Sequence, residues 1–192
     1  MQRRPLLLAM PSLLVLPAHA QRKRPAEVPE ALRLQSEAQM RFFGLRIYDI
    51  RLWVSEHVNA DNWSRQILAL ELEYARSLSG REIAKRSLVE MRRQAEISEE
   101  KAQRWLTEME AAFPDVKAGD RISGLFEPGR GVQFFVNSQP RRQIADPEFA
   151  RLFSGIWLAT QSSEPGMRDQ LLKRPADSSQ ARGEHRGPSS QG

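Results

Sequence analysis

The side chains that most often carry chemistry are scarce in this chain of 192 residues. It has no cysteine, which excludes disulfides, thiolate metal ligands, a cysteine nucleophile and a lipid-modified cysteine anchor. Of its three histidines, His19 and His185 lie near the ends of the chain, and only His57 lies in its body. We therefore expect no histidine-rich metal site, and we predict neither a metal nor a cofactor.

Motifs of the common enzyme classes are missing as well. The sequence has no G-x-S-x-G nucleophile turn and no glycine-rich phosphate loop after a strand, and Gly129-Arg130-Gly131 is better explained as a turn. Glu71 and Glu73 could form a pair of catalytic carboxylates. They lie on the polar side of an alternating strand, however, which favours solvent-exposed side chains. We therefore predict no catalytic residue.

The net charge of +5 resides at the two ends of the chain. Residues 1–20 carry +2, residues 21–30 carry +1 and residues 173–192 carry +2, so residues 31–172 are neutral. A surface that binds nucleic acid needs an excess of lysine and arginine on the folded body. We therefore predict no nucleic-acid partner.

The first 20 residues have the three parts of a secretory signal peptide. Arg3 and Arg4 form a charged start, residues 6–16 are apolar, and Ala18-His19-Ala20 is typical of a cleavage site. The apolar run is shorter than the roughly 20 residues that a membrane span needs. We predict a periplasmic or secreted protein, cleaved at about Ala20, with an uncleaved membrane anchor as the alternative.

The rest of the chain is expected to form one domain over residues 31–173, preceded by a loose arm at residues 21–30. Residues 31–54 suit strands interrupted at Gly44, and residues 67–74 alternate strictly between apolar and polar side chains. Further short strands are expected at residues 121–127, 132–136 and 141–144, separated by turn residues. Residues 174–192 are rich in proline, serine and glycine and are expected to be disordered.

Four helices are expected between and after these strands. Residues 79–95 begin with Ser79-Gly80-Arg81-Glu82, which is a capping-box pattern, and a second helix covers residues 98–113. Asp146 is a good N-cap for a third helix, and Pro147 suits its first position. The fourth helix is expected at residues 166–173.

Several of these segments resemble conserved parts of bacterial chalcone isomerase-like proteins. The similar stretches are Gly44-Leu45-Arg46-Ile47-Tyr48, Leu52-Trp53, Gly119-Asp120, Pro128-Gly129-Arg130-Gly131, Asn137, Asp146, Phe149-Ala150 and Ile156-Trp157-Leu158. The resemblance covers about residues 32–172. It implies an α+β fold, an open-faced β-sandwich in which a large antiparallel sheet is covered by helices on one face.

The resemblance also implies a ligand cleft between the sheet and the helices. Plant chalcone isomerases use an arginine, a strand threonine, and a tyrosine and an asparagine on a helix. Here the tyrosine position falls at Ile83 and the asparagine position at Glu90, and the threonine has no clear counterpart. These departures favour a binder over an enzyme. The residues that we predict to contact a ligand are Arg41, Arg46, Tyr48, Tyr74 and Trp157, with an exposed strand position as the alternative for each arginine and core packing for each aromatic residue.

Three functions remain open at this point. The first is an exported, non-catalytic binder of a small amphipathic ligand, such as a fatty acid or a phenolic compound. The second is an intramolecular lyase or isomerase of the chalcone isomerase type with rearranged donors. The third is an accessory protein that interacts with another protein and has no ligand. Fold resemblance alone does not choose among them.

Overall fold

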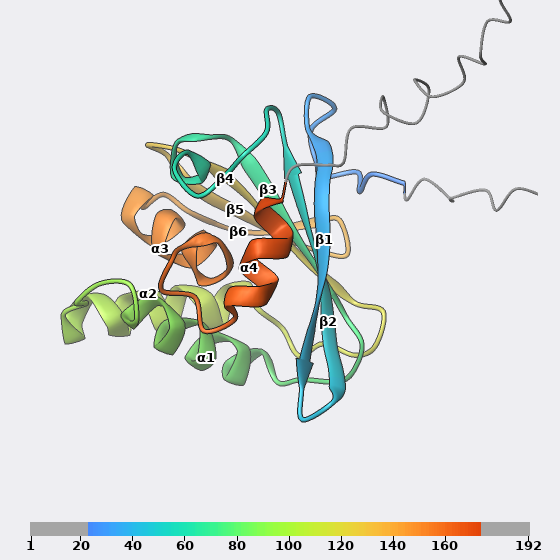
Figure 1. Cartoon of the computed structure of the whole chain (residues 1–192). Coiled ribbons are helices and arrows are strands. Elements are labelled where there is room, and N and C mark those ends of the chain that lie inside the picture. The colour runs from blue at the N-terminus through green and yellow to red at the C-terminus, as the bar shows by residue number, and fades with distance from the viewer. Residues whose placement is uncertain (1–22, 174–192) are drawn as a thin grey trace, which may run out of the picture.

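The computed structural model describes residues 23–173. The predicted signal peptide at residues 1–20 and the predicted tail at residues 174–192 lie outside the described residues. Six strands form one antiparallel sheet in chain order, with β1 and β6 at its open edges (Figure 1). The strands are β1 (Arg33–Phe42), β2 (Leu45–Val54), β3 (Leu68–Tyr74), β4 (Arg121–Glu127), β5 (Gly131–Val136) and β6 (Gln139–Ile144).

The helices gather on one face of this sheet, as Figure 1 shows. They are α1 (Gly80–Arg92), α2 (Glu99–Ala112), α3 (Pro147–Leu158) and α4 (Pro165–Leu172), and a short 3-10 helix η1 (Trp63–Arg65) precedes β3. The predicted α+β class, with a large antiparallel sheet covered by helices on one face, is therefore confirmed. Within residues 23–173, no helix combines the length and the hydropathy that crossing a bilayer would require.

The side chains that face the helices form the main core, and the strand register explains which ones they are. Leu72 of β3 pairs with Ile50 of β2 and with Ile122 of β4, and Leu70 pairs with Leu52 and Gly124. Successive side chains of a strand point to opposite faces, so the alternating pattern at residues 67–74 directs Leu68, Leu70 and Leu72 all inward. Leu52 and Leu70 are almost completely buried.

The predicted start of α3 is confirmed by its contacts. Asp146 accepts hydrogen bonds from the backbone N–H groups of Glu148 and Phe149, both at 3.0 Å, and Pro147 occupies the first turn. The second carboxylate oxygen accepts from Trp105 Nε1 at 2.9 Å, which joins α3 to α2. The cap therefore stabilises the helix and also fixes its position.

The capping box predicted at Ser79 is not formed. Its side chain makes no capping hydrogen bond. Instead, the backbone N–H of Gly80 donates to Asp115 Oδ1 at 2.9 Å, from a segment 35 residues away. A Cβ atom on Gly80 would lie 2.1 Å from the carbonyl oxygen of Phe113, so the first turn of α1 packs directly on the end of α2. A long-range carboxylate has replaced the local cap.

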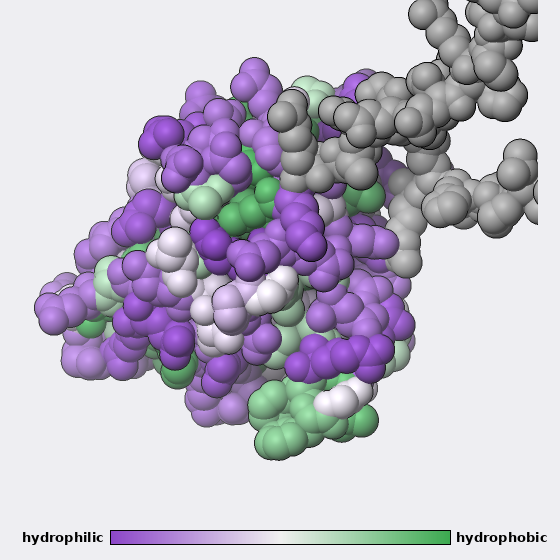
Figure 2. Space-filling model, in the orientation of Figure 1, coloured by the Kyte–Doolittle hydropathy of each residue, from purple (hydrophilic) through white to green (hydrophobic). Residues whose placement is uncertain are grey.

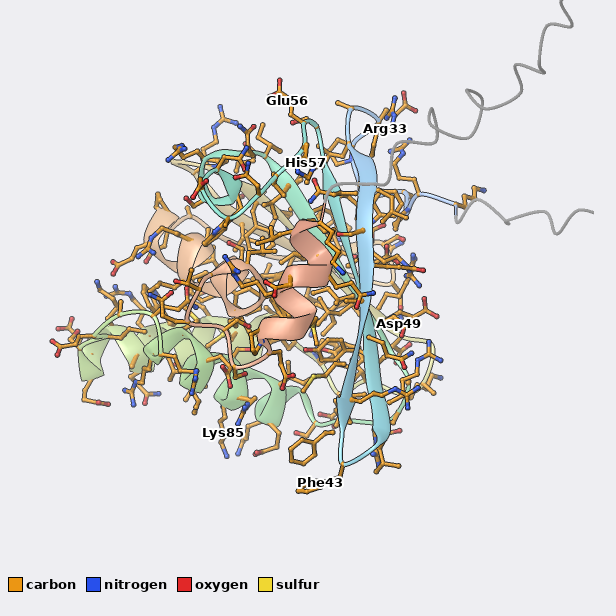
Figure 3. All side chains as sticks on the ribbon, in the orientation of Figure 1. Arg33, Phe43, Asp49, Glu56, His57 and Lys85 are labelled. Carbon is orange, nitrogen blue, oxygen red and sulfur yellow. The ribbon has the colours of Figure 1, made fainter. Side chains whose placement is uncertain are left out.

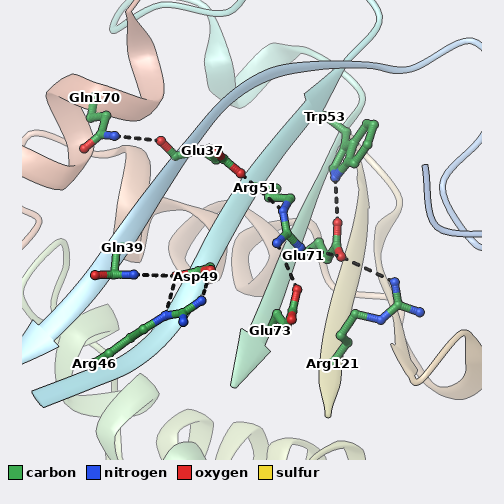
Figure 4. Close-up of polar contacts among 10 residues, drawn as sticks. All are labelled: Glu37, Gln39, Arg46, Asp49, Arg51, Trp53, Glu71, Glu73, Arg121 and Gln170. Carbon is green, nitrogen blue, oxygen red and sulfur yellow. Dashed lines mark hydrogen bonds and ion pairs between the residues drawn. The ribbon is translucent and has the colours of Figure 1, made fainter. Parts of the chain in front are cut away.

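The prediction that Glu71 and Glu73 are solvent-exposed was wrong for Glu71, which is 2% exposed. Glu71 Oε1 accepts from Arg51 at 2.9 Å, and its Oε2 accepts from Trp53 Nε1 at 3.1 Å (Figure 4). Arg51 also bonds Glu73 at 2.9 Å, and Arg121 approaches Glu71 at 3.4 Å. The outer face of the sheet thus carries a buried ion-pair network.

The arm predicted to be loose is packed against this outer face within its described part, residues 23–30. Val28 is 1% exposed and lies with Leu32, Trp53 and Ala69 in a second small apolar cluster. Ser123 Oγ donates to Glu27 Oε1 at 2.7 Å, which ties the arm to β4. The proline and charged residues of the arm mask Val28, its apolar anchor, in the sequence.

Candidate functional site

A cavity of about 430 Å³ lies between the inner face of the sheet and the helices. Its buried wall consists mainly of leucine and aromatic side chains: Leu70, Leu72, Tyr74, Phe113, Ile122, Phe126, Phe134, Phe153, Ile156 and Trp157. Cavities of this size and lining are typical of sites for small organic ligands. Within residues 23–173, no cluster of three histidine or acidic side chains could hold a metal ion.

Gly124 shapes the floor of the cavity. It faces inward in the middle of β4, where it pairs with Leu70 and Phe134. A Cβ atom here would lie 2.9 Å from the ring of Phe126 and 3.3 Å from that of Phe134. The missing side chain therefore allows two aromatic rings to lie across the strand, where they form a smooth apolar surface.

The hydrogen-bonded side chains of Tyr48 and Trp157 form a polar group in this otherwise apolar wall. Trp157 Nε1, from α3, donates to the hydroxyl oxygen of Tyr48, from β2, at 3.1 Å. Tyr74 packs edge-on against Tyr48 with 5.9 Å between the ring centroids. Because the Tyr48 oxygen accepts from tryptophan, its own proton remains available to a ligand acceptor.

Burial, and to a smaller extent the nearby carboxylates of Glu164 and Glu90, raise the pKa of Tyr48 to about 12 against the opposing effect of the Trp157 hydrogen bond. Burial also raises the pKa of Tyr74, with a smaller contribution from Tyr48. Both phenols are therefore neutral in the physiological range. Tyr48 can act there as a hydrogen-bond donor and not as a base.

The α1 helix contributes charged side chains to the same cavity. Glu90 is 6% exposed, and its Oε1 lies 2.6 Å from a guanidinium nitrogen of Arg86. Glu90 Oε2 is buried without a hydrogen-bond partner, and Arg93 Nε lies 3.6 Å from it. Glu82 and Glu164 also line the cavity. The polar end thus holds one arginine and three carboxylates.

The opening of the cavity is marked by those lining residues that are also exposed. They are Phe42 at the end of β1, with 59% of its surface exposed, and Glu82 and Arg86 on α1. Met40 and Ile47, which are half-buried neighbours of Phe42 in the β1–β2 hairpin, line the same region. The entrance therefore lies between this hairpin and the first half of α1.

Of the predicted ligand contacts, Tyr48, Tyr74 and Trp157 come together in the cavity wall. Arg41 and Arg46 lie outside it, which corrects their expected position. Arg41 donates to the carbonyl oxygen of Gly44 at 3.0 Å, and Arg46 Nε donates to Asp49 Oδ1 at 3.0 Å on the outer side of the sheet. A register shift between Met40 and Arg41 alters the alternation in this hairpin, and Asp49 draws Arg46 away.

Arg86 is the cation that the sequence reasoning missed. It lies one turn before Glu90, and three residues after Ile83, on a helix that was expected to cover the sheet. Ile83 and Glu90 were identified from the resemblance alone, and both line the cavity. The neighbouring position of Arg86 on the same helix face was the signal that could have identified it.

Comparisons with known proteins agree with this architecture. A family model described as chalcone isomerase-like matches residues 28–173. An uncharacterized protein of Haemophilus influenzae is 28% identical over 135 residues, which is 70% of this chain and 65% of that protein's length. The crystal structure of the Arabidopsis thaliana fatty-acid binding protein AtFAP1 aligns with a TM-score of 0.58 at 11% identity, over 78% of this chain and 90% of the other. This structural match supports the fold.

Proposed function

Since the chain belongs to the chalcone isomerase-like family, we propose that it binds one small amphipathic molecule in the cavity and does not convert it. The observation that carries this proposal is the 430 Å³ cavity, whose apolar wall ends in a small polar group. Sites of this kind bury most of a ligand and orient it through a few polar contacts. Tyr48 and Glu90 supply such contacts.

The residues at the cavity argue against isomerase chemistry. Ring closure of a chalcone requires donors that stabilise the developing enolate charge. Ile83 has no donor, and Glu90 would place a carboxylate near that negative charge. A Tyr48 hydroxyl with a pKa of about 12 cannot provide a general base. The cavity retains the means to hold a ligand without the family's means to transform it.

A long-chain fatty acid is the first ligand to test, because the structural neighbour is named as a fatty-acid binding protein. Its carboxylate would accept from Tyr48 and pair with Arg86, which is the lining cation. The three lining carboxylates favour the opposite kind of headgroup, an amine or alcohol that donates to Glu90 Oε2. Ligands with either headgroup can place their hydrocarbon chain against the same apolar wall, so the measured affinities for the two kinds of ligand must distinguish them.

The test is a calorimetric titration, in which delipidated protein is titrated in turn with palmitic acid, hexadecylamine and hexadecanol. A Ser87→Leu variant would fill part of the cavity, because Ser87 is buried in its wall and its hydroxyl bonds only the Ile83 carbonyl of the same helix, at 2.8 Å. We expect saturable binding of one molecule per chain, and about tenfold or greater weakening in Ser87→Leu, which corresponds to about 1.4 kcal/mol or more.

Val89→Leu is the matched control, since Val89 is 53% exposed on the other side of α1. It should bind the ligand as the wild type does. Absence of saturable binding to all three compounds would exclude the proposal and would leave the accessory role as the better explanation. Loss of enone absorbance from a chalcone, dependent on this protein, would instead establish an isomerase.

A further inference from the structure

The tip of the β1–β2 hairpin presents apolar side chains to solvent that the core does not use. We define the apolar tip as Phe42, Phe43 and Leu45, which are 59%, 90% and 56% exposed. In Figure 2 it forms the hydrophobic patch at the lower end of the molecule. Figure 3 shows Phe43 pointing away from the body at this end.

The backbone of the tip holds these side chains outward. Phe43 has φ 47° and Gly44 has φ 78°, so both lie in the left-handed region that a tight hairpin turn requires. A bulky side chain is rare with a positive φ, and asparagine or glycine is the usual residue. Phe43 therefore combines an unfavourable backbone conformation with an unfavourable solvent exposure. Its ring packs edge-on against the ring of Phe42, with 4.5 Å between the centroids, and Phe42 is itself exposed.

A pair of arginines lies directly behind the apolar tip. Phe42 pairs with Leu45, and Arg41 pairs with Arg46 in the next position of the ladder. Like charges opposite each other destabilise a sheet. Arg46 has Asp49 as a partner, whereas the contact found for Arg41 is a backbone carbonyl. Residues 41–46 contain no acidic side chain, so the hairpin carries an apolar layer followed by a cationic layer.

This order of layers matches the surface of an anionic lipid bilayer, where phosphate groups overlie the acyl chains. Apolar side chains enter the acyl boundary by about 5–10 Å, and arginine reaches the headgroups from there. The tip exposes roughly 400 Å² of apolar surface, since a phenylalanine can bury about 150–250 Å². That is about half of what a stable protein partner usually covers on one side.

We infer that the apolar tip, framed by Arg41 and Arg46, docks this protein on anionic membranes. Phe42 belongs both to the tip and to the opening of the cavity. Docking would therefore turn that opening toward the bilayer, the source from which an amphipathic ligand of the proposed kind is drawn. This consequence rests on the proposed function, whereas the docking surface itself does not.

A Phe43→Trp variant tests the position of the tip directly. The four native tryptophans are between 1% and 8% exposed, so the new indole supplies the exposed fluorescence signal. Vesicles of equal phosphatidylglycerol and phosphatidylcholine should shift its emission to shorter wavelength, and brominated acyl chains should quench it. The control, Val89→Trp, should show neither change. An unshifted, unquenched Phe43→Trp signal would overturn the inference.

A second measurement uses the double variant Phe43→Asn/Leu45→Thr, whose residues suit the hairpin and do not line the cavity. All variants are made in the full chain, so any lipid affinity of residues 1–22 is common to them. We expect the double variant to co-sediment with the anionic vesicles at least tenfold more weakly than the wild type. Arg41→Gln should weaken this binding by a smaller factor, and on neutral vesicles Arg41→Gln and the wild type should bind equally.

The same double variant should bind palmitic acid or hexadecylamine in solution as the wild type does. If the wild-type protein docks on anionic vesicles but binds neither of these ligands nor hexadecanol, the proposed function is excluded and the docking surface is retained. Equal vesicle binding by wild type and double variant would exclude the docking surface. So would a wild-type dimer in lipid-free sedimentation that the double variant cannot form, because a second copy would then cover the tip.

Discussion

Tyr48 and Tyr74 are the two tyrosines of the chain, and both line the cavity. Because burial raises the pKa of Tyr48 to about 12, its neutral form is favoured in the folded state relative to the unfolded chain. The associated stability is fully present below the ordinary pKa of about 10 and is lost as pH rises through about 12. Tyr74 shifts in the same direction.

We therefore expect no phenolate absorbance near pH 10 in an alkaline titration of the folded protein. The signal should appear together with the loss of near-ultraviolet circular dichroism, because ionisation of the buried Tyr74 and the half-buried Tyr48 is coupled to unfolding. Denatured protein is the control and should titrate near pH 10. A stepwise phenolate signal near pH 10, with the fold intact, would show that one hydroxyl is open to water.

At the scale of elements, the buried amide of Gln35 helps to join α4 to the edge strand β1, together with Ser36, which donates to the Leu171 carbonyl oxygen, and Gln170, which donates to the Glu37 carbonyl oxygen. Gln35 lies at a register shift in β1, and 9% of it is exposed. Its Oε1 accepts from the Val58 N–H at 2.8 Å, and its Nε2 donates to the carbonyl oxygens of Val58 at 2.9 Å and Leu171 at 3.1 Å. The register shift in β1 thus lets the Gln35 amide contact both the loop at Val58 and the end of α4 at Leu171.

Replacement of Gln35 by alanine should lower the free energy of unfolding by about 2–4 kcal/mol, because the buried N–H and C=O groups of Val58 lose the amide that pairs with both. The Leu171 carbonyl oxygen loses one of its two donors and keeps Ser36. Denaturant unfolding measures the loss, and hydrogen exchange should show faster opening of α4 than of α1. Gln103→Ala is the control, since Gln103 is an exposed residue of α2 and should change stability by less than about 0.5 kcal/mol. Equal effects of the two substitutions would refute the bridging role.

At the scale of the whole molecule, the two faces of the sheet are stabilised in different ways. The inner face packs apolar side chains against the helices, and the outer face uses ion pairs beneath the N-terminal arm. Arg51 connects strands on this outer face: it lies 3.5 Å from Glu37 of β1 and 2.9 Å from both Glu71 and Glu73 of β3 (Figure 4). Arg121 extends the network to β4.

Arg51→Ala should destabilise the protein by about 3–5 kcal/mol, because Glu71 would keep a buried charge while losing its closest cation. The loss should appear as a lower midpoint of one cooperative denaturant transition. Arg130→Ala removes an ion pair whose arginine is 80% exposed, and it should change stability by less than about 0.5 kcal/mol. A loss below about 1 kcal/mol for Arg51→Ala would mean that water reaches Glu71.

Local patterns determined most of the fold. Alternation along residues 67–74 predicted β3 and its inward leucines, and Asp146 with Pro147 predicted the start of α3. Segment order and the family resemblance then predicted helices on one face of an antiparallel sheet. These features follow from periodicities of two and 3.6 residues, and from caps within a few residues, which are properties of the chain itself.

Tertiary structure decided which segments pack against each face of the sheet. Alternation placed Glu71 opposite the leucines, but only pairing with Arg51 and covering by the arm made that position buried. The resemblance predicted a cleft with Tyr48 in it, yet a register shift kept Arg41 outside and α1 supplied Arg86 instead. Such outcomes depend on contacts between segments far apart in sequence, which no local periodicity encodes.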